Sequence, residues 1–202
     1  MLLTVFEFII AYFIGSVCSA VIVSRLFGLP DPRSEGSKNP GATNVLRLAG
    51  KKYAAIVLVA DMLKGLLPVL FAKLIGAGPT ALGYICFAAV LGHMYPLFFG
   101  FKGGKGVATA IGALLGFQFY LGILVVATWL IVANVTRYSS LASIIAMTFS
   151  PLYSIAILQS MDAFIPLLVI AIFILYKHHE NVTRLLAGEE SKIHFKKAKK
   201  NP

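Results

Sequence analysis

The sequence is poor in acidic residues and in cysteine. Asp and Glu together number 8 against 18 Lys and Arg, which gives a formal net charge of +10. The aspartates, at positions 31, 61 and 162, are widely separated, so the chain lacks the paired aspartates of two-metal phosphotransfer sites. Cys18 and Cys86 lie inside apolar runs and predict neither a disulfide framework nor a metal site. We expect no metal and no cofactor.

Familiar signatures of catalysis are missing as well. No His is followed by Asp five positions later, and no Ser or Cys stands in a G-x-S-x-G turn, which carries the nucleophile of many hydrolases. A nucleotide-binding loop needs G-x-x-x-x-G-K followed by Ser or Thr, whereas Gly104-Lys105 is followed by Gly106. Any chemistry is therefore expected to work without a metal or a classical protein nucleophile.

What the sequence does contain is apolar. Hydrophobic residues make up 58% of the chain and the mean hydropathy is +0.85, above the roughly 45–50% apolar content of soluble domains. Period-two alternation is absent, which argues against an outer-membrane barrel. The bases lie between apolar runs, where they indicate membrane topology and ligand charge rather than a nucleic-acid partner. We predict an all-α integral membrane protein with a single polytopic domain over residues 1–202.

The apolar runs define the expected spans. They fall at residues 2–27, 53–75, 79–98, 107–134, 139–160 and 162–177. Most approach the roughly 20 residues that cross the hydrocarbon of about 30 Å. The run 107–134 would form a helix of about 42 Å at about 1.5 Å per residue, so one tilted span or two short spans turning at Gly116-Phe117-Gln118 would fit it. No basic segment precedes the first run, which we expect to be retained rather than cleaved.

The distribution of bases decides between one and two spans in this run. Basic residues concentrate in 28–52, 99–106, 135–143 and beyond 177, and the positive-inside rule places all of them in the cytoplasm. That placement requires an even number of crossings between residues 106 and 135. We therefore predict seven transmembrane helices, with the N-terminus periplasmic and the C-terminus cytoplasmic. The basic tail from about residue 191 is expected to attract anionic lipid.

The first polar segment, DPRSEGSKNPGATNVLR from Asp31, is rich in turn-forming residues and predicts an ordered loop. It supplies short polar groups and, in Arg47, a planar fork suited to phosphate. The short polar residues are Ser37, Asn39, Thr43 and Asn44. The alternative is a solvated connector.

The second polar segment, GFKGGKGVATA from Gly100, is a glycine-rich turn that leads into an apolar run. Glycines let backbone N–H groups approach an anion, and Lys102 and Lys105 bring positive charge. Gly103 and Gly104 are the candidate N–H donors. The alternative is a tight re-entrant turn whose lysines extend to the membrane surface.

Further polar groups complete the candidate site. In KHHENVTRLLAGEE, His178 and Asn181 would share a helix face, although helix-end capping would also explain them. Ser143 follows a basic helix end at Arg137. Within the bilayer, Asp61 and Lys64 lie one helical turn apart and predict an internal ion pair, with a proton relay as the alternative.

These segments resemble the motifs of the bacterial acyl-phosphate:glycerol-3-phosphate acyltransferases. The matching motifs are GSKNPGATNVLR from Gly36, GHMYPLFFGFKGGKGVAT from Gly92 and HHENVTRLLAGEE from His178. Their order and spacing agree, so the resemblance covers nearly the whole chain. Lys38 and Lys177 stand where that family commonly has glycine and arginine.

The resemblance implies a seven-helix enzyme of the bacterial inner membrane. It implies acyl transfer from acyl phosphate to the sn-1 hydroxyl of glycerol 3-phosphate, giving lysophosphatidic acid and phosphate at the start of phospholipid synthesis. The implied partners are acyl phosphate, glycerol 3-phosphate, membrane lipids and, by docking, the peripheral enzyme that makes the acyl phosphate.

Carried over by position, the motifs place a set of polar residues around two head groups. The expected catalytic residues are Arg47, Lys105, His178 and Asn181, and the expected substrate-binding residues are Ser37, Asn39, Thr43, Asn44, Lys102, Gly103, Gly104 and Ser143. Arg47 and Lys105 would clamp phosphate. The proton of the attacking hydroxyl would pass either to His178 or, as we prefer, to a phosphate oxygen of the donor.

Two other classes of protein would share some of these features with an acyltransferase. A transporter of phosphorylated metabolites would also need basic loops, but it predicts inverted repeats and charges at the midplane of the bilayer, and no internal repeat is seen. A structural anchor that recruits soluble enzymes would need the basic tail but neither the glycine-lysine turn nor the loop that ends at Arg47.

Overall fold

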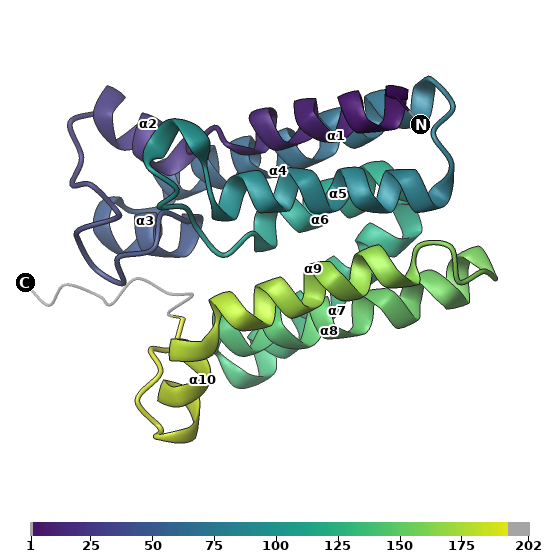
Figure 1. The fold of residues 1–202 in the computed structure, drawn as a ribbon. Coiled ribbons are helices and arrows are strands. Elements are labelled where there is room, and N and C mark those ends of the chain that lie inside the picture. The colour runs from purple at the N-terminus through teal and green to yellow at the C-terminus, as the bar shows by residue number, and fades with distance from the viewer. Residues whose placement is uncertain (1, 194–202) are drawn as a thin grey trace, which may run out of the picture.

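The computed structural model describes residues 2–193, and within this range every element is helical (Figure 1). The elements are α1 (Leu2–Gly15), α2 (Ser19–Leu26), α3 (Ala42–Ala49), α4 (Lys51–Leu74), α5 (Pro79–Met94), the short 3₁₀ helix η1 (Leu97–Phe99), α6 (Val107–Phe117), α7 (Phe119–Thr136), α8 (Ser139–Leu158), α9 (Phe164–Lys177) and α10 (His179–Leu186). The prediction of an all-α chain is confirmed.

Fewer helical stretches than the predicted seven are long and apolar enough to cross a membrane. Among residues 2–193, five helical stretches are long and apolar enough to cross a membrane, and α9 with α10, bent by 59°, would make a sixth. Helix α6 has 11 residues, which at about 1.5 Å per residue reaches only about 16 Å, short of a hydrocarbon of about 30 Å. Seven crossings, and the side of the membrane on which each terminus lies, stay predictions.

The break predicted inside the run 107–134 is present. Helix α6 ends at Phe117, Gln118 is extended, and α7 begins at Phe119. The Lys73 ammonium of α4 donates to the Phe117 carbonyl at 2.9 Å, which satisfies a free carbonyl at the end of α6. The chain therefore reverses at Gln118, and Figure 1 shows α7 returning toward the end of the molecule from which α6 started.

The helices form two groups that meet along α5, α6, α7 and α9. Helices α1, α4, α5 and α6 make one group, and α7, α8 and α9 make the other (Figure 1). Small residues allow close approach within the first group, because a Cβ on Gly65 of α4 would lie 2.1 Å from the Thr109 carbonyl of α6. Large apolar side chains remain exposed along the outer faces of α1, α4 and α7, as expected of surfaces that face lipid.

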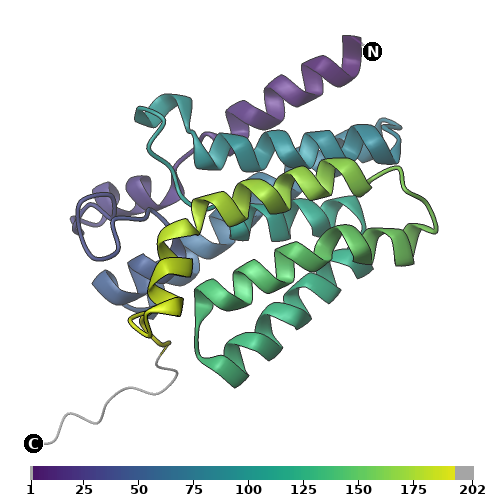
Figure 2. The ribbon, with the colours of Figure 1, turned by 60° about the horizontal axis from the view of Figure 1, so that its bottom comes forward.

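One end of the bundle carries the polar connections. The loop before α3, the turn before α6, the start of α8 and helix α10 all lie at this end (Figures 1 and 2). The α4–α5, α6–α7 and α8–α9 connections lie at the opposite end (Figure 1). The basic segments thus share one end, as the charge distribution predicted.

Candidate functional site

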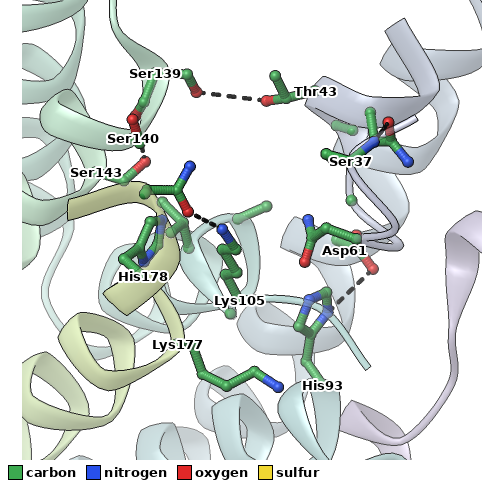
Figure 3. Close-up of a pocket in the computed structure, with 18 of the residues that line it drawn as sticks. Ser37, Thr43, Asp61, His93, Lys105, Ser139, Ser140, Ser143, Lys177 and His178 are labelled. Atoms are coloured by element: carbon green, nitrogen blue, oxygen red, sulfur yellow. Dashed lines mark hydrogen bonds and ion pairs between the residues drawn. The ribbon is translucent and has the colours of Figure 1, made fainter. Parts of the chain in front are cut away.

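A cavity of about 1090 Å³ opens at the polar end of the bundle. This volume is at the upper end of the roughly 300–1,000 Å³ of small-molecule sites. The predicted residues that line it are Ser37, Asn39, Thr43, Asn44, Arg47, Gly103, Lys105, Ser143, His178 and Asn181. The three sequence segments that were expected to form a site therefore converge on one space (Figure 3).

The loop before α3 is held in shape by Asn44. Its Nδ2 donates to the carbonyls of Pro32 and Glu35, both at 3.0 Å, and its Oδ1 accepts from the Ser37 N–H at 2.9 Å. Asn44 is 1% exposed. Because both amide N–H bonds are used inside the chain, Asn44 shapes this loop, and its expected contact with substrate stays a prediction.

Arg47 is the exposed cation on this wall. It lies in the last turn of α3 and lines the cavity. No carboxylate among residues 2–193 forms an ion pair with it. Nearby, the Thr43 and Ser139 hydroxyls lie 3.4 Å apart and join α3 to α8 across the opening (Figure 3). The guanidinium is therefore available to an external anion.

Lys105 reaches the cavity from the glycine turn. Its ammonium donates to the Asn181 Oδ1 (Figure 3). Burial lowers the pKa of Lys105 to about 8, the charge on Arg184 adds to this effect, and Glu190 opposes it. Among residues 2–193 no carboxylate forms an ion pair with this half-buried ammonium, so an anion that enters the cavity would stabilise its charge.

Glu190 organises the groups around Asn181. Its carboxylate accepts from the Ser140 hydroxyl and the Asn181 Nδ2, both at 2.7 Å, and from the Arg184 Nε at 2.8 Å. Burial raises the pKa of Glu190, but these hydrogen bonds outweigh it and hold the pKa below the ordinary value. Glu190 therefore fixes both Asn181 and the base Arg184.

His178 occupies the junction between α9 and α10. It is 3% exposed, and its Nδ1 lies 2.7 Å from the Ile174 carbonyl, which places the proton on Nδ1. The remaining nitrogen, Nε2, then carries a lone pair. Beside it, Ser143 accepts from the Trp129 Nε1 at 3.0 Å and donates to the Ser139 carbonyl at 2.8 Å, so its hydroxyl proton is used within the chain.

Two predicted residues of the glycine turn lie outside the cavity lining. Lys102 is exposed and does not line the cavity. Gly104 is buried and its N–H donates to the His93 carbonyl at 3.2 Å, so this N–H is engaged within the chain. Only Gly103 of the two glycines lines the cavity.

The predicted ion pair between Asp61 and Lys64 is confirmed. The Lys64 Nζ lies 2.8 Å from the Asp61 Oδ1 and also donates to the Val17 carbonyl at 2.7 Å, in the break between α1 and α2. Asp61 also faces His93 of α5, and both line the cavity. The pair therefore connects the cavity lining at Asp61 to the break between α1 and α2.

Sequence reasoning missed several lining residues. His93, Trp129 and Lys177 come from runs that were interpreted as apolar or, for Lys177, from a position given no role. The Lys177 Nζ lies 4.9 Å from the centre of the Tyr95 ring. Neither this contact nor the approach of α5 to the turn leaves a local sequence signal, although the charge of Lys177 beside His178 could have been noticed.

Part of the cavity lining is apolar. Side chains from α4, α6 and α7 form this part, namely Leu58, Met62, Val107, Ala108, Ile111, Val126 and Leu130. The cavity therefore combines a cationic mouth at Arg47 and Lys105 with apolar walls, as a site for an amphiphile would. Among residues 2–193 no cluster of three or more His, Cys, Asp or Glu side chains is arranged to hold a metal ion.

Comparisons with known proteins agree with this arrangement. The sequence profile of the glycerol-3-phosphate acyltransferase family matches residues 5–188. A glycerol-3-phosphate acyltransferase of Legionella pneumophila (strain Corby) is 57% identical over 196 residues, covering 97% of this chain and 71% of the relative. One of Shewanella sp. (strain W3-18-1) is 52% identical over 200 residues, covering 99% and 98%.

Solved structures show the same fold. The crystal structure of PlsY, an integral membrane glycerol 3-phosphate acyltransferase, in its glycerol 3-phosphate form has a TM-score of 0.89 and 41% identity, covering 95% of this chain and 96% of that chain. Its lysophosphatidic acid form has a TM-score of 0.87 and 40% identity, covering 95% of each. The chain belongs to the glycerol-3-phosphate acyltransferase family and is a multi-pass membrane acyltransferase.

Proposed function

We propose that this protein transfers an acyl group from acyl phosphate to the sn-1 hydroxyl of glycerol 3-phosphate. The products are 1-acyl-glycerol 3-phosphate (lysophosphatidic acid) and inorganic phosphate. The observation that carries the proposal is the cavity itself, which is lined by apolar side chains and by Arg47 and Lys105, two cations that no carboxylate among residues 2–193 pairs with. PlsY is known in a glycerol 3-phosphate form and in a lysophosphatidic acid form, which supports this acceptor and this product.

The cations answer the main electrostatic problem of the reaction. Two phosphate groups approach each other at the membrane surface, and their repulsion must be offset by cations and N–H donors. In our proposal Arg47 and Lys105 clamp phosphate oxygens, while Ser37, Asn39 and Thr43 bind the remaining polar groups of the two substrates. Asn181 orients Lys105, and the acyl chain lies against the apolar side chains of α4, α6 and α7.

The bond changes need no protein nucleophile. Acyl phosphate is a mixed anhydride, so the acceptor hydroxyl attacks the acyl carbon, the C–O bond to phosphate breaks, and phosphate leaves with the electron pair. The hydroxyl proton passes to an oxygen of the donor phosphate, which is the route we prefer, or to the His178 Nε2. In the first route His178 and Asn181 orient the reacting groups.

The proposal also sets the location of the reaction. The protein lies in a bacterial inner membrane, and the polar end of the bundle faces the cytoplasm because the basic segments gather there. Glycerol 3-phosphate then enters from the cytoplasm, and the peripheral enzyme that makes acyl phosphate docks at this end to deliver its product. Surrounding lipid receives the lysophosphatidic acid.

Phosphate release tests the proposal against its rivals. Purified protein in detergent is given palmitoyl phosphate and glycerol 3-phosphate without coenzyme A, and phosphate is measured over time. We expect release that depends on both substrates. A transporter or a structural anchor would release none above the spontaneous hydrolysis of the donor, and that result would overturn the proposal.

A further inference from the structure

The glycines of the turn before α6 are fitted against one residue of α5. A Cβ on Gly103 would lie 2.0 Å from the His93 carbonyl oxygen, and a Cβ on Gly104 would lie 2.3 Å from the His93 Nε2. Real Cβ atoms essentially never approach another atom within 3.0 Å. Since the Gly104 N–H also donates to the His93 carbonyl at 3.2 Å, the turn lies directly on both the backbone and the ring of His93.

His93 is itself held from the other side by a buried charge. Its Nδ1 lies 3.6 Å from the Asp61 Oδ1 (Figure 3). Asp61 is bound in turn to Lys64 at 2.8 Å, and the exposed fractions of Asp61, Lys64 and His93 are 1%, 6% and 6%. Charges buried at this depth are expensive to leave unpaired, so their partners keep a fixed geometry.

The orientation of the imidazole follows from this contact. A carboxylate next to Nδ1 favours the tautomer that carries its proton on Nδ1, which leaves the unprotonated Nε2 against Gly104. The gap of 3.6 Å is longer than a hydrogen bond, and among residues 2–193 the His93 Nδ1 has no hydrogen-bond partner. The Asp61 carboxylate, which also contacts the Lys64 ammonium at 2.8 Å, therefore holds this edge of the ring by charge.

We propose that His93, anchored by Asp61, is a positioning residue that sets the glycine turn and thereby aims Lys105 at the phosphate of glycerol 3-phosphate. Lys105 directly follows Gly104, so any displacement of the turn displaces the start of this side chain. In an enzyme site, a misplacement of about 1 Å can lower the reaction rate on the order of a hundredfold. The inference rests on the proposed function for the identity of the ligand. It also explains why glycines occupy this turn, since a side chain there would collide with His93 whether or not the turn N–H groups contact substrate.

A double-mutant cycle between Gly104 and His93 tests this role. His93→Asn keeps an N–H donor close to the position of Nδ1 for Asp61 but removes the Nε2 edge, and His93→Ala removes the whole ring. Each is combined with Gly104→Ala, and the dissociation constant for glycerol 3-phosphate is measured by calorimetry on purified protein. Ser150→Ala, a buried change on α8 outside the cavity, is the control for general loss of stability.

We expect Gly104→Ala to weaken glycerol 3-phosphate binding about tenfold or more in the unmodified protein and less than about threefold in the His93→Asn protein. His93→Ala alone should weaken binding about tenfold while its melting temperature stays near that of Ser150→Ala. Equal losses from Gly104→Ala in both backgrounds, or unchanged binding in His93→Ala, would overturn the inference. If Gly104→Ala has the smaller effect expected in the His93→Asn protein but the unmodified protein releases no phosphate, only the proposed function is overturned. If the unmodified protein does not bind glycerol 3-phosphate, both are overturned.

Discussion

The depressed pKa of Lys105 makes the reaction sensitive to alkaline pH. This pKa is lowered to about 8 mainly by burial, so the ammonium is about 90% charged at pH 7 and about 10% charged at pH 9. If the charged form binds the phosphate of glycerol 3-phosphate, kcat/KM for this substrate follows the charged fraction of the free enzyme. Because the phosphate of glycerol 3-phosphate changes its own charge at about pH 6, the informative range lies above pH 7, where we expect kcat/KM to fall about tenfold between pH 7 and pH 9.

The assay is phosphate release with donor and glycerol 3-phosphate both well below saturation, so that the rate reports the free enzyme, measured from pH 6 to pH 10 and corrected for hydrolysis of the donor. The matched control is Lys105→Arg, because a guanidinium stays charged over this whole range. Its kcat/KM is expected to be lower but to lack the alkaline fall. A flat profile in the unmodified protein, or the same fall in Lys105→Arg, would refute the assignment of this cation to phosphate binding.

Four further predictions follow from the same cavity. Arg47→Ala should lower kcat/KM about 10- to 150-fold, because a charge-assisted hydrogen bond contributes about 1.5–3 kcal/mol; Lys102→Ala, outside the cavity, should change it less than about twofold, and equal effects would contradict the placement of Arg47. His178→Gln should lower kcat less than about a hundredfold if the donor phosphate accepts the proton; near-complete retention would exclude His178 as the base, and a larger loss would contradict this prediction and leave both proton routes open. Asn44→Ala should lower the free energy of unfolding by about 1–3 kcal/mol in thermal denaturation, since its hydrogen bonds hold the loop before α3; unchanged stability would contradict that role. A reporter fused at Gln118 should lie outside the cytoplasm, and cytoplasmic behaviour would contradict the reversal of the chain there.

Hydropathy and charge predicted the fold to a useful depth. The length of the run 107–134 and the position of the bases on either side of it indicated a reversal near Gln118, and the helix breaks at that residue. The same patterns placed the basic segments at one end of the bundle. They did not predict that α9 bends by 59° into α10, because helix ends depend on packing that local composition does not encode.

The sequence predicted which residues gather at the site, while their roles stay predictions. Arg47, Lys105, His178 and Asn181 were carried over from the motifs of the family that the chain resembles, and all four line one cavity. Asn44 has a side chain that could bind a substrate, yet its amide N–H groups donate to carbonyls of its own loop. Interpreting a side chain as a substrate contact requires knowing which partners the fold already gives it, and that information arises only from residues distant in sequence.

The glycine turn shows the same limit. Glycine next to lysine indicated free N–H groups for an anion, whereas the fold engages the Gly104 N–H with His93. The conformational freedom of glycine explains such turns equally well when it permits the close approach of another helix. Only the packing of α5 against the turn separates the two explanations.

The central claim is that the cationic mouth accepts an acyl group already activated as its phosphate. The most direct measurement offers purified protein palmitoyl phosphate and palmitoyl-coenzyme A in parallel, each with glycerol 3-phosphate, and quantifies 1-acyl-glycerol 3-phosphate and phosphate together. The account predicts product only from palmitoyl phosphate, with one phosphate released for each acyl group transferred. Product formed from palmitoyl-coenzyme A, or product formed without stoichiometric phosphate, would contradict it.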